Sequence, residues 1–349
     1  MKTYGNLYPR VCAFENLYLA TMKAARGKRR WPNVANFLVG LEGELVQLCA
    51  ELEEQTYEPG HYRTFMIHEP KDRMISAAPF RDRVVHHALC NVIGPLFERR
   101  MVYDCWANRV GKGSHRALDR FQGFCRQFRY VLKCDIAKHF PSIDHEILKA
   151  KVRRVVRCKP TLWLIDKIID GSNAQEPVVQ RFPADNLFTP LERRRGLPIG
   201  NLTSQFFANF HLDALDHFAK ETLQVPGYVR YVDDFALFGD SKRELWEWRD
   251  KIERFLVTDR LKLHPTKTRV FRTSDGLDFL GFRVWPHRRR LKKENLNRMK
   301  RRLRLLQMLR AAGRIGLPEV RQRIRSWLAH AAHGDTYGVA GALLREFTF

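Results

Sequence analysis

The stretch Tyr-Val-Arg-Tyr-Val-Asp-Asp-Phe-Ala-Leu-Phe, residues 228–238, decides how this chain is interpreted. Two adjacent acids, Asp233 and Asp234, stand at its centre between apolar flanks. The pattern predicts two short strands and a tight turn, with both carboxylates held at the tip of a rigid hairpin. Carboxylate oxygens are the ligands that hard divalent cations prefer. A solvated Asp-Asp turn is the alternative, and the rest of the chain decides between the two.

A third acid, Asp135, follows a short predicted strand, residues 130–134. Phosphoryl transfer from a nucleotide uses two metal ions roughly 4 Å apart, held by acids from separate strands. The sequence therefore predicts Asp135, Asp233 and Asp234 as catalytic metal ligands, with the backbone carbonyl of Ile136 as a further ligand. Two Mg²⁺ ions are the predicted cofactor, and Mn²⁺ is the alternative metal.

The composition indicates a polyanionic partner. The 349 residues carry a formal net charge of +24, and 44% of them are hydrophobic, which argues against disorder. Many phosphates would balance this charge, and a membrane surface is the competing explanation. No apolar run approaches the roughly 20 residues that span a bilayer, and the N-terminus lacks the apolar core of a signal peptide. Seven scattered cysteines without a Cys-x-x-Cys pair favour free thiols, so we expect a cytoplasmic protein that does not enter a membrane.

Periodicity and breakers predict an alternation of helices and short strands. An amphipathic stretch runs from about Val34 to Leu52, and two basic strands, residues 62–68 and 73–77, flank the breaker at 69–72. Asp144 is the expected cap of a helix that follows Asp135. The other predictions are a helix over 79–97, an irregular insertion over about 171–195, a tight loop over 196–200, a helix over about 203–223, a helix over 244–256 and strands over 277–285.

Several residues are candidate contacts for a nucleoside triphosphate. Lys71 and Arg73, on the basic hairpin, could reach phosphates, although two cations on a hairpin are often only solvated. Gly200 would allow the backbone to approach a nascent base pair. Phe140, five residues after Asp135, would lie beneath the sugar and exclude a 2′-hydroxyl; ordinary core packing is the alternative. Lys267 could neutralise or protonate a leaving pyrophosphate.

The C-terminal segment from residue 287 is strongly basic, while Leu296, Met299, Leu303 and Leu306 mark one apolar helix face. A cationic run with Glu294 as its one acid favours a phosphate backbone as partner over a solvated helix face. His330 and His333 could bind metal, but packing or nucleic-acid contact is favoured. The candidate nucleic-acid contacts in the basic run are Arg288, Arg289, Arg290, Lys292, Lys293 and Arg301.

These motifs resemble those of reverse transcriptases over nearly the whole chain from about Tyr62 to Trp285. In that family Asp135 matches the first metal-binding motif and residues 231–234 match the Tyr-x-Asp-Asp box. The segment Phe279-Leu280-Gly281 looks like the primer grip. The resemblance implies an α+β right-hand polymerase with N-terminal helices and fingers over 1–128, a palm over 129–286 and a helical thumb over 287–349.

One motif narrows the resemblance. Where most reverse transcriptases have a Gln before the loop glycine, this chain has Ile199, and the run from Ile199 to Gln205 reads Ile-Gly-x-x-x-Ser-Gln. That pattern is similar to the enzymes of diversity-generating retroelements in the group II intron-like branch of bacteria and phages. It implies contacts of Ile199, Gly200 and Gln205 with the incoming nucleotide. We expect Ile199, together with Arg73, to lower fidelity, because Ile199 offers only an apolar contact where Gln could hydrogen-bond; simple packing is the alternative.

The resemblance also implies partners and a pathway. Its members copy a template-repeat RNA into cDNA, with errors at adenines, and the cDNA then replaces part of a target gene in mutagenic retrohoming. Template RNA, cDNA, a primer strand, dNTPs and a pentameric accessory variability protein are the expected partners. We expect no endonuclease, so the primer would come from elsewhere. A group II intron-like or phage-defence reverse transcriptase is the near alternative, and an RNA-binding scaffold with a vestigial polymerase site is the distant one.

Overall fold

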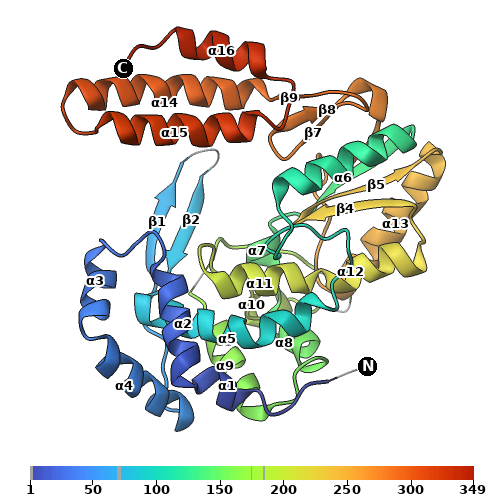
Figure 1. The fold of residues 1–349 in the computed structure, drawn as a ribbon. Coiled ribbons are helices and arrows are strands. Elements are labelled where there is room, and N and C mark those ends of the chain that lie inside the picture. The colour runs from blue at the N-terminus through green and yellow to red at the C-terminus, as the bar shows by residue number, and fades with distance from the viewer. Residues whose placement is uncertain (1–2, 69–71, 174, 184) are drawn as a thin grey trace.

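The computed structural model describes residues 3–68, 72–173, 175–183 and 185–349. In these ranges, the chain forms helices and three antiparallel sheets (Figure 1). This mixture confirms the predicted α+β class. None of the helices in the described ranges combines the length and the apolar character needed to cross a bilayer.

The N-terminal region is a helical cluster around one long helix, α5 (Phe80–Glu98), as predicted for residues 79–97. Leu45, Leu48 and Leu52 lie on the buried face of the fourth helix of this cluster, at spacings of three and four residues. The amphipathic stretch from Val34 to Leu52 is not one helix, because the chain leaves helical geometry at Gly40. The surrounding helices are α1 (Tyr8–Cys12), α2 (Phe14–Ala25), α3 (Pro32–Val39) and α4 (Leu41–Glu53).

The predicted basic hairpin is present next to this cluster. Strands β1 (Arg63–Ile67) and β2 (Arg73–Ala77) pair antiparallel, with Arg63 opposite Ala77 and Ile67 opposite Arg73. Figure 1 shows the hairpin rising from the N-terminal cluster toward the C-terminal helices. Lys71, a predicted phosphate contact, lies outside the described residues.

The central sheet has two buried faces. Alternate residues of each strand point to opposite sides, so Val131 packs with α6 (Ser114–Gln127) while Leu132 packs with α13 (Lys242–Thr258). The strands, in spatial order, are β4 (Gly227–Tyr231), β5 (Asp234–Gly239), β3 (Tyr130–Asp135) and β6 (Arg269–Arg272).

The outer edge of β4 is covered by the segment before α6. The amide of Arg230 donates to the carbonyl of Asp104 at 2.9 Å, and the amide of Trp106 donates to the carbonyl of Arg230 at 2.9 Å. Cys105 thereby forms a parallel bridge with Arg230. This segment leaves β6 as the exposed edge of the sheet.

The helices between β3 and β4 differ from the prediction at one point. Asp144 caps α8 as expected, accepting from the amide of Ile147 at 3.1 Å. The predicted single helix over 203–223 is wrong: α11 ends before Leu212, a second short helix follows, and the segment ends in a π-helical turn, Phe218–Thr222. Within 171–195, the described residues 171–173, 175–183 and 185–195 contain one short helix and are otherwise irregular. The helices of this region are α7 (His139–Ser142), α8 (His145–Arg153), α9 (Lys159–Asp170), α10 (Thr189–Glu192), α11 (Leu202–His211) and α12 (Asp213–His217).

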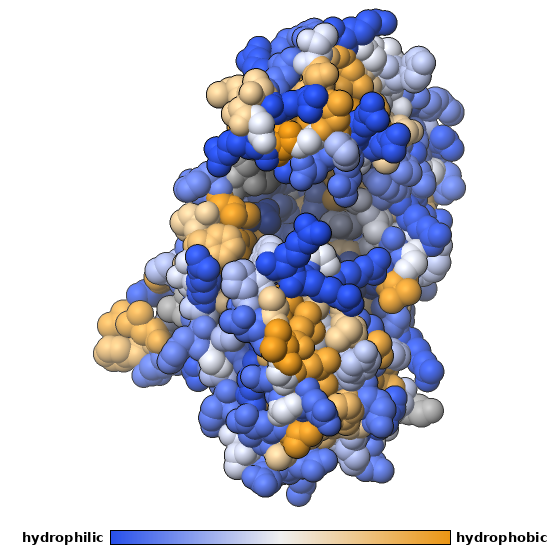
Figure 2. All heavy atoms as spheres, turned by 60° about the vertical axis from the view of Figure 1, so that its left-hand side comes forward, coloured by the Kyte–Doolittle hydropathy of each residue, from blue (hydrophilic) through white to orange (hydrophobic). Residues whose placement is uncertain are grey.

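The C-terminal region starts with a small sheet and continues as helices. The sheet consists of β7 (Leu277–Phe279), β8 (Phe282–Val284) and β9 (Arg289–Leu291), so it extends past residue 286, the predicted end of the palm. Met299, Leu303 and Leu343 form a separate core among the helices. Figure 2 shows a hollow between this region at the top and the body below it, with mostly hydrophilic side chains around it. The helices are α14 (Lys293–Ala311), α15 (Leu317–Ala331) and α16 (Tyr337–Arg345).

Candidate active site

The two adjacent acids lie at the tip of the β4–β5 hairpin. Tyr231 pairs with Asp234, so Val232 and Asp233 form a two-residue connection. Val232 adopts φ of 58°, a conformation that β-branched residues rarely take. The hairpin therefore places Asp233 and Asp234 at one end of the sheet through a strained turn.

Asp135 lies beside this turn because β3 is the neighbour of β5. Its Cα is paired in register with that of Asp234. The amide of Ile136 donates to the carbonyl of Asp233 at 3.3 Å. Among the described residues, no donor is hydrogen-bonded to the carbonyl of Ile136, the predicted further ligand. The three acids predicted from the sequence thus meet at one end of the two central strands.

Burial makes the two adjacent acids, Asp233 and Asp234, harder to ionise. It raises the pKa of Asp234 to about 6, although a quarter of the side-chain surface stays accessible. Burial also raises the pKa of Asp233, the nearby Asp135 raises it further, and the cations Lys267 and Arg73 oppose this rise. Arg73 itself is exposed at the start of β2, and its role as a phosphate contact stays a prediction.

Two lysines contact the acids in this structure. Lys267 Nζ lies 2.7 Å from Asp135 Oδ1, and Lys133 Nζ lies 3.2 Å from Asp234 Oδ2. Lys133 also donates to the carbonyl of Asp278 on β7 at 2.8 Å. With these pairs formed, no group of three His, Cys, Asp or Glu side chains among the described residues is arranged to hold a metal ion.

The donor chemistry nevertheless fits a hard divalent cation. All three side chains offer carboxylate oxygens, and Asp234 Oδ1 is buried without a hydrogen-bond partner. A nearby cation would favour the ionised form of Asp233 and Asp234, whose pKa values burial raises. These acids could therefore bind a metal once Lys133 and Lys267 turn aside.

A cavity of about 380 Å³ lies directly beside Asp135. Lys133, Lys267, Asp278 and Arg283 line it, so it connects the acids with the small sheet β7–β9. A larger cavity of about 800 Å³, between α9 and residues 58–62, contains none of the predicted site residues.

The loop over 196–201 is fastened to the basic hairpin. The carbonyl of Ile199 accepts from the amide of Ser76 at 2.9 Å, and Asn201 bonds to both the carbonyl of Ser76 and the amide of Ala78. Gly200 has φ of +121°, and a Cβ there would lie 2.9 Å from Ile75 Cγ2. The loop and β2 therefore form one continuous wall, and Asn201 was not predicted.

The remaining predicted nucleotide contacts lie on either side of this loop. Phe140 is partly buried against the N-terminal core, and its carbonyl accepts from the amide of Leu197 at 3.0 Å. Gln205 is exposed on the first turn of α11. The geometry permits both the packing role and the sugar contact of Phe140, so that contact stays a prediction.

The predicted primer-grip residues form the turn between β7 and β8. Leu280 and Gly281 have φ of 43° and 88°, which makes the turn tight. Phe279 is buried and stacks on Phe121 of α6 with centroids 4.3 Å apart. Of these three residues, Phe279 is thus a core residue that supports the turn.

Some of the basic C-terminal residues have acidic partners from elsewhere in the chain. Arg289 Nη1 lies 2.7 Å from Asp119 Oδ1, and Lys292 Nζ lies 2.9 Å from Asp278 Oδ2. Neither partner was predicted: Asp119 lies 170 positions before Arg289, and Asp278 belongs to the small sheet, on β7. The predicted contacts that remain exposed are Arg288, Arg290, Lys293 and Arg301.

His330 and His333 both contact His115 of α6. The rings of His115 and His333 stack with centroids 3.5 Å apart, and His115 Nε2 lies 3.1 Å from His330 Nδ1. Stacked rings favour packing between α6 and α15 over a shared metal.

Comparison with known proteins identifies the family. Residues 68–284, more than half of the chain, match the family described as reverse transcriptase (RNA-dependent DNA polymerase). The chain belongs to this family. The match confirms the predicted enzyme class, a reverse transcriptase that is an RNA-directed DNA polymerase, and implies the right-hand polymerase fold.

Three relatives of this reverse transcriptase are similar over different lengths. Protein YkfC of Escherichia coli is 24% identical over 282 residues, 69% of this chain and 71% of that protein. Nuclear intron maturase 1, mitochondrial, of Arabidopsis thaliana is 25% identical over 31% of this chain and 15% of that protein. The putative COX1/OXI3 intron 1 protein of Saccharomyces cerevisiae is 18% identical over 64% of this chain and 25% of that protein. The likeness therefore includes an intron maturase and a putative intron protein.

Proposed function

We propose that Asp135, Asp233 and Asp234, with the carbonyl of Ile136, hold two Mg²⁺ ions for DNA synthesis on an RNA template. The observation that carries this proposal is that the three acids meet at one end of the central strands, beside a strained hairpin turn. When bound, the ions would activate the primer 3′-hydroxyl and bind the triphosphate and its leaving pyrophosphate.

The side chains around the acids have distinct tasks in this proposal. Asp234 must lose its proton to act as a ligand, and a pKa of about 6 lets it do so near neutral pH. Lys267, whose side chain is 44% exposed, can leave Asp135 and bring its ammonium to the departing pyrophosphate. Arg73 is exposed on β2, its charge lowers the pKa of Asp233, and it can bind phosphate oxygens of the incoming nucleotide.

We further propose that this reverse transcriptase serves a diversity-generating retroelement. The segment from Ile199 to Gln205 supports this. Its backbone is bonded to β2. Ile199 replaces the Gln of most reverse transcriptases, so a hydrogen bond that could check base-pair geometry is lost. In this proposal the enzyme copies a template-repeat RNA with errors at adenines. A pentameric accessory protein would join the complex of enzyme and RNA.

An intron-related reverse transcriptase is the second candidate. The similarity to an intron maturase and to an intron-encoded protein favours it. The two candidates share the reaction and differ in fidelity and in partner. Fidelity is therefore the property that separates them.

The test is primer extension by the purified protein on an adenine-containing RNA template, with Mg²⁺ and dNTPs, followed by sequencing of the cDNA. The reaction is run with and without a co-expressed accessory protein and cognate RNA. Ile199→Gln is the diagnostic variant, and the double variant Asp233→Asn/Asp234→Asn is the inactive control.

Errors confined to template adenines, and reduced in Ile199→Gln, are the expected result. Accurate copying would move the enzyme to the intron-related candidate. Extension by the double variant would show that the two acids are not the metal ligands.

A further inference from the structure

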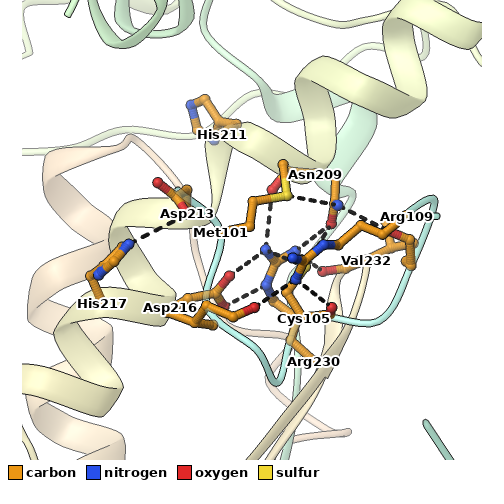
Figure 3. Close-up of polar contacts among 12 residues, drawn as sticks. Met101, Cys105, Arg109, Asn209, His211, Asp213, Asp216, His217, Arg230 and Val232 are labelled. Carbon is orange, nitrogen blue, oxygen red and sulfur yellow. Dashed lines mark hydrogen bonds and ion pairs between the residues drawn. The ribbon is translucent and has the colours of Figure 1, made fainter. Parts of the chain in front are cut away.

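A fully buried arginine lies behind the catalytic turn. Arg230 of β4 and its partner Asp216 of α12 both have 0% of their side-chain surface exposed (Figure 3). Burying two charges is unfavourable unless their geometry is excellent and all their hydrogen-bonding groups are satisfied. The contacts of this guanidinium group therefore indicate what it does.

All three nitrogens of the guanidinium are hydrogen-bonded. Nε donates to Asp216 Oδ1 at 2.6 Å, and Nη2 donates to Asp216 Oδ2 at 2.5 Å. Nη2 also contacts the carbonyl of Asn209 at 3.1 Å and Cys105 Sγ at 3.2 Å, and Nη1 donates to Asn209 Oδ1 at 2.9 Å. These partners come from three separate parts of the chain, so the guanidinium group cannot shift without breaking several bonds.

The remaining contact reaches the catalytic turn. Nη1 of Arg230 donates to the carbonyl of Val232 at 3.0 Å. This carbonyl belongs to the peptide that joins Val232 to Asp233. A β-branched residue with positive φ persists only where the surroundings hold it there, and Arg230 supplies such a restraint.

We infer that Arg230, anchored by Asp216, is a positioning residue that fixes the Val232–Asp233 peptide and thereby the two adjacent carboxylates. Arg230 itself touches none of the three acids by hydrogen bond or ion pair among the described residues. It acts through the backbone of the turn. The inference rests on the proposed role of Asp233 and Asp234 as metal ligands.

The test removes the restraint without leaving a buried charge. In the double variant Arg230→Met/Asp216→Leu both charged partners become apolar side chains of similar size, a change that is often neutral for stability. Tyr228→Phe is the matched control: it deletes the hydroxyl that donates to Asp216 at 2.7 Å but leaves the bond between Arg230 and Val232 intact.

The readouts are Mn²⁺ binding to the protein without substrate, followed by electron paramagnetic resonance, and steady-state primer extension. Mutating partners that orient metal ligands commonly lowers affinity by about 10- to 100-fold. We expect the double variant to bind Mn²⁺ at least tenfold more weakly and to lose kcat, while KM for dNTP stays within about twofold. Tyr228→Phe should match the wild type in both measurements.

A folded double variant with wild-type Mn²⁺ affinity would overturn the inference. If the double variant does not fold, Arg230→Lys takes its place. A lysine keeps the positive charge opposite Asp216, but its single nitrogen cannot reach all the partners that the three guanidinium nitrogens of Arg230 bind. Wild-type Mn²⁺ affinity in Arg230→Lys would then overturn it. A different result would contradict the proposed function itself: wild-type Mn²⁺ affinity in the double variant Asp233→Asn/Asp234→Asn.

Discussion

Removing the charge of Asp234 should stabilise the protein while it abolishes its activity. Burial raises the pKa of Asp234 from its ordinary value of 3.8 to about 6. Because each pKa unit corresponds to about 1.4 kcal/mol, ionising this group in the folded protein costs on the order of 3 kcal/mol. Asp234→Asn avoids this cost, since the amide has the shape of the acid without its charge.

The sign of the pH dependence follows from linkage. The folded-state pKa lies above the unfolded one, so the protonated acid stabilises the fold below about pH 4, and that contribution is lost as the pH rises through about 6. The advantage of Asp234→Asn should therefore be largest at pH 8 and vanish near pH 4. Bound Mg²⁺ should also reduce it, because the cation stabilises the ionised wild type.

Urea unfolding in EDTA at pH 4, 6 and 8 measures this difference, and Asp250→Asn is the matched control. Asp250 is an exposed acid of α13 whose neutralisation should change stability by about 0.5 kcal/mol or less. Equal or lower stability of Asp234→Asn at pH 8 would refute the reasoning. Primer extension by the same variant should be undetectable.

Three further changes probe the walls of the site. Gly200→Ala forces a Cβ to within 2.9 Å of Ile75 Cγ2 at positive φ, so KM for dNTP in primer extension should rise severalfold; an unchanged KM would mean that the loop does not shape the pocket. Asn201→Ala leaves two buried backbone groups without partners, which should lower the free energy of unfolding by about 2 to 5 kcal/mol in urea and speed proteolysis at the 196–201 loop; a stability equal to the wild type would contradict this. Lys267→Gln should reduce the single-turnover extension rate at least tenfold with little change in Tm, because this lysine is half exposed and its pair with Asp135 contributes little stability; a normal rate would exclude it as the proton donor.

Local patterns predicted the parts of the site that depend on short stretches of chain. The apolar flanks of Asp233 and Asp234 specify the hairpin, and the strand that ends at Asp135 places the third acid at the same end of the sheet. Lys133 could have been found in the same way. It lies two residues before Asp135, hence on the same face of β3.

Contacts between distant segments could not be predicted in this way. Arg230 pairs with Asp216 on α12, a short helix that follows the end of α11 where the sequence predicted one unbroken helix. The bonds of Asn201 to β2 likewise join residues more than a hundred positions apart. No periodicity in a single sequence carries that information.

The cover over β4 has a consequence for how the protein behaves at high concentration. An unpaired strand edge is a template for pairing with another molecule. Asp104 and Trp106 pair with the free edge of β4. At the opposite edge of the sheet, β6 begins with Arg269 and ends with Arg272, whose charges repel a second copy. The sheet that carries the catalytic acids is therefore protected at both margins from joining the sheet of a neighbouring molecule, which favours a preparation free of β-aggregates.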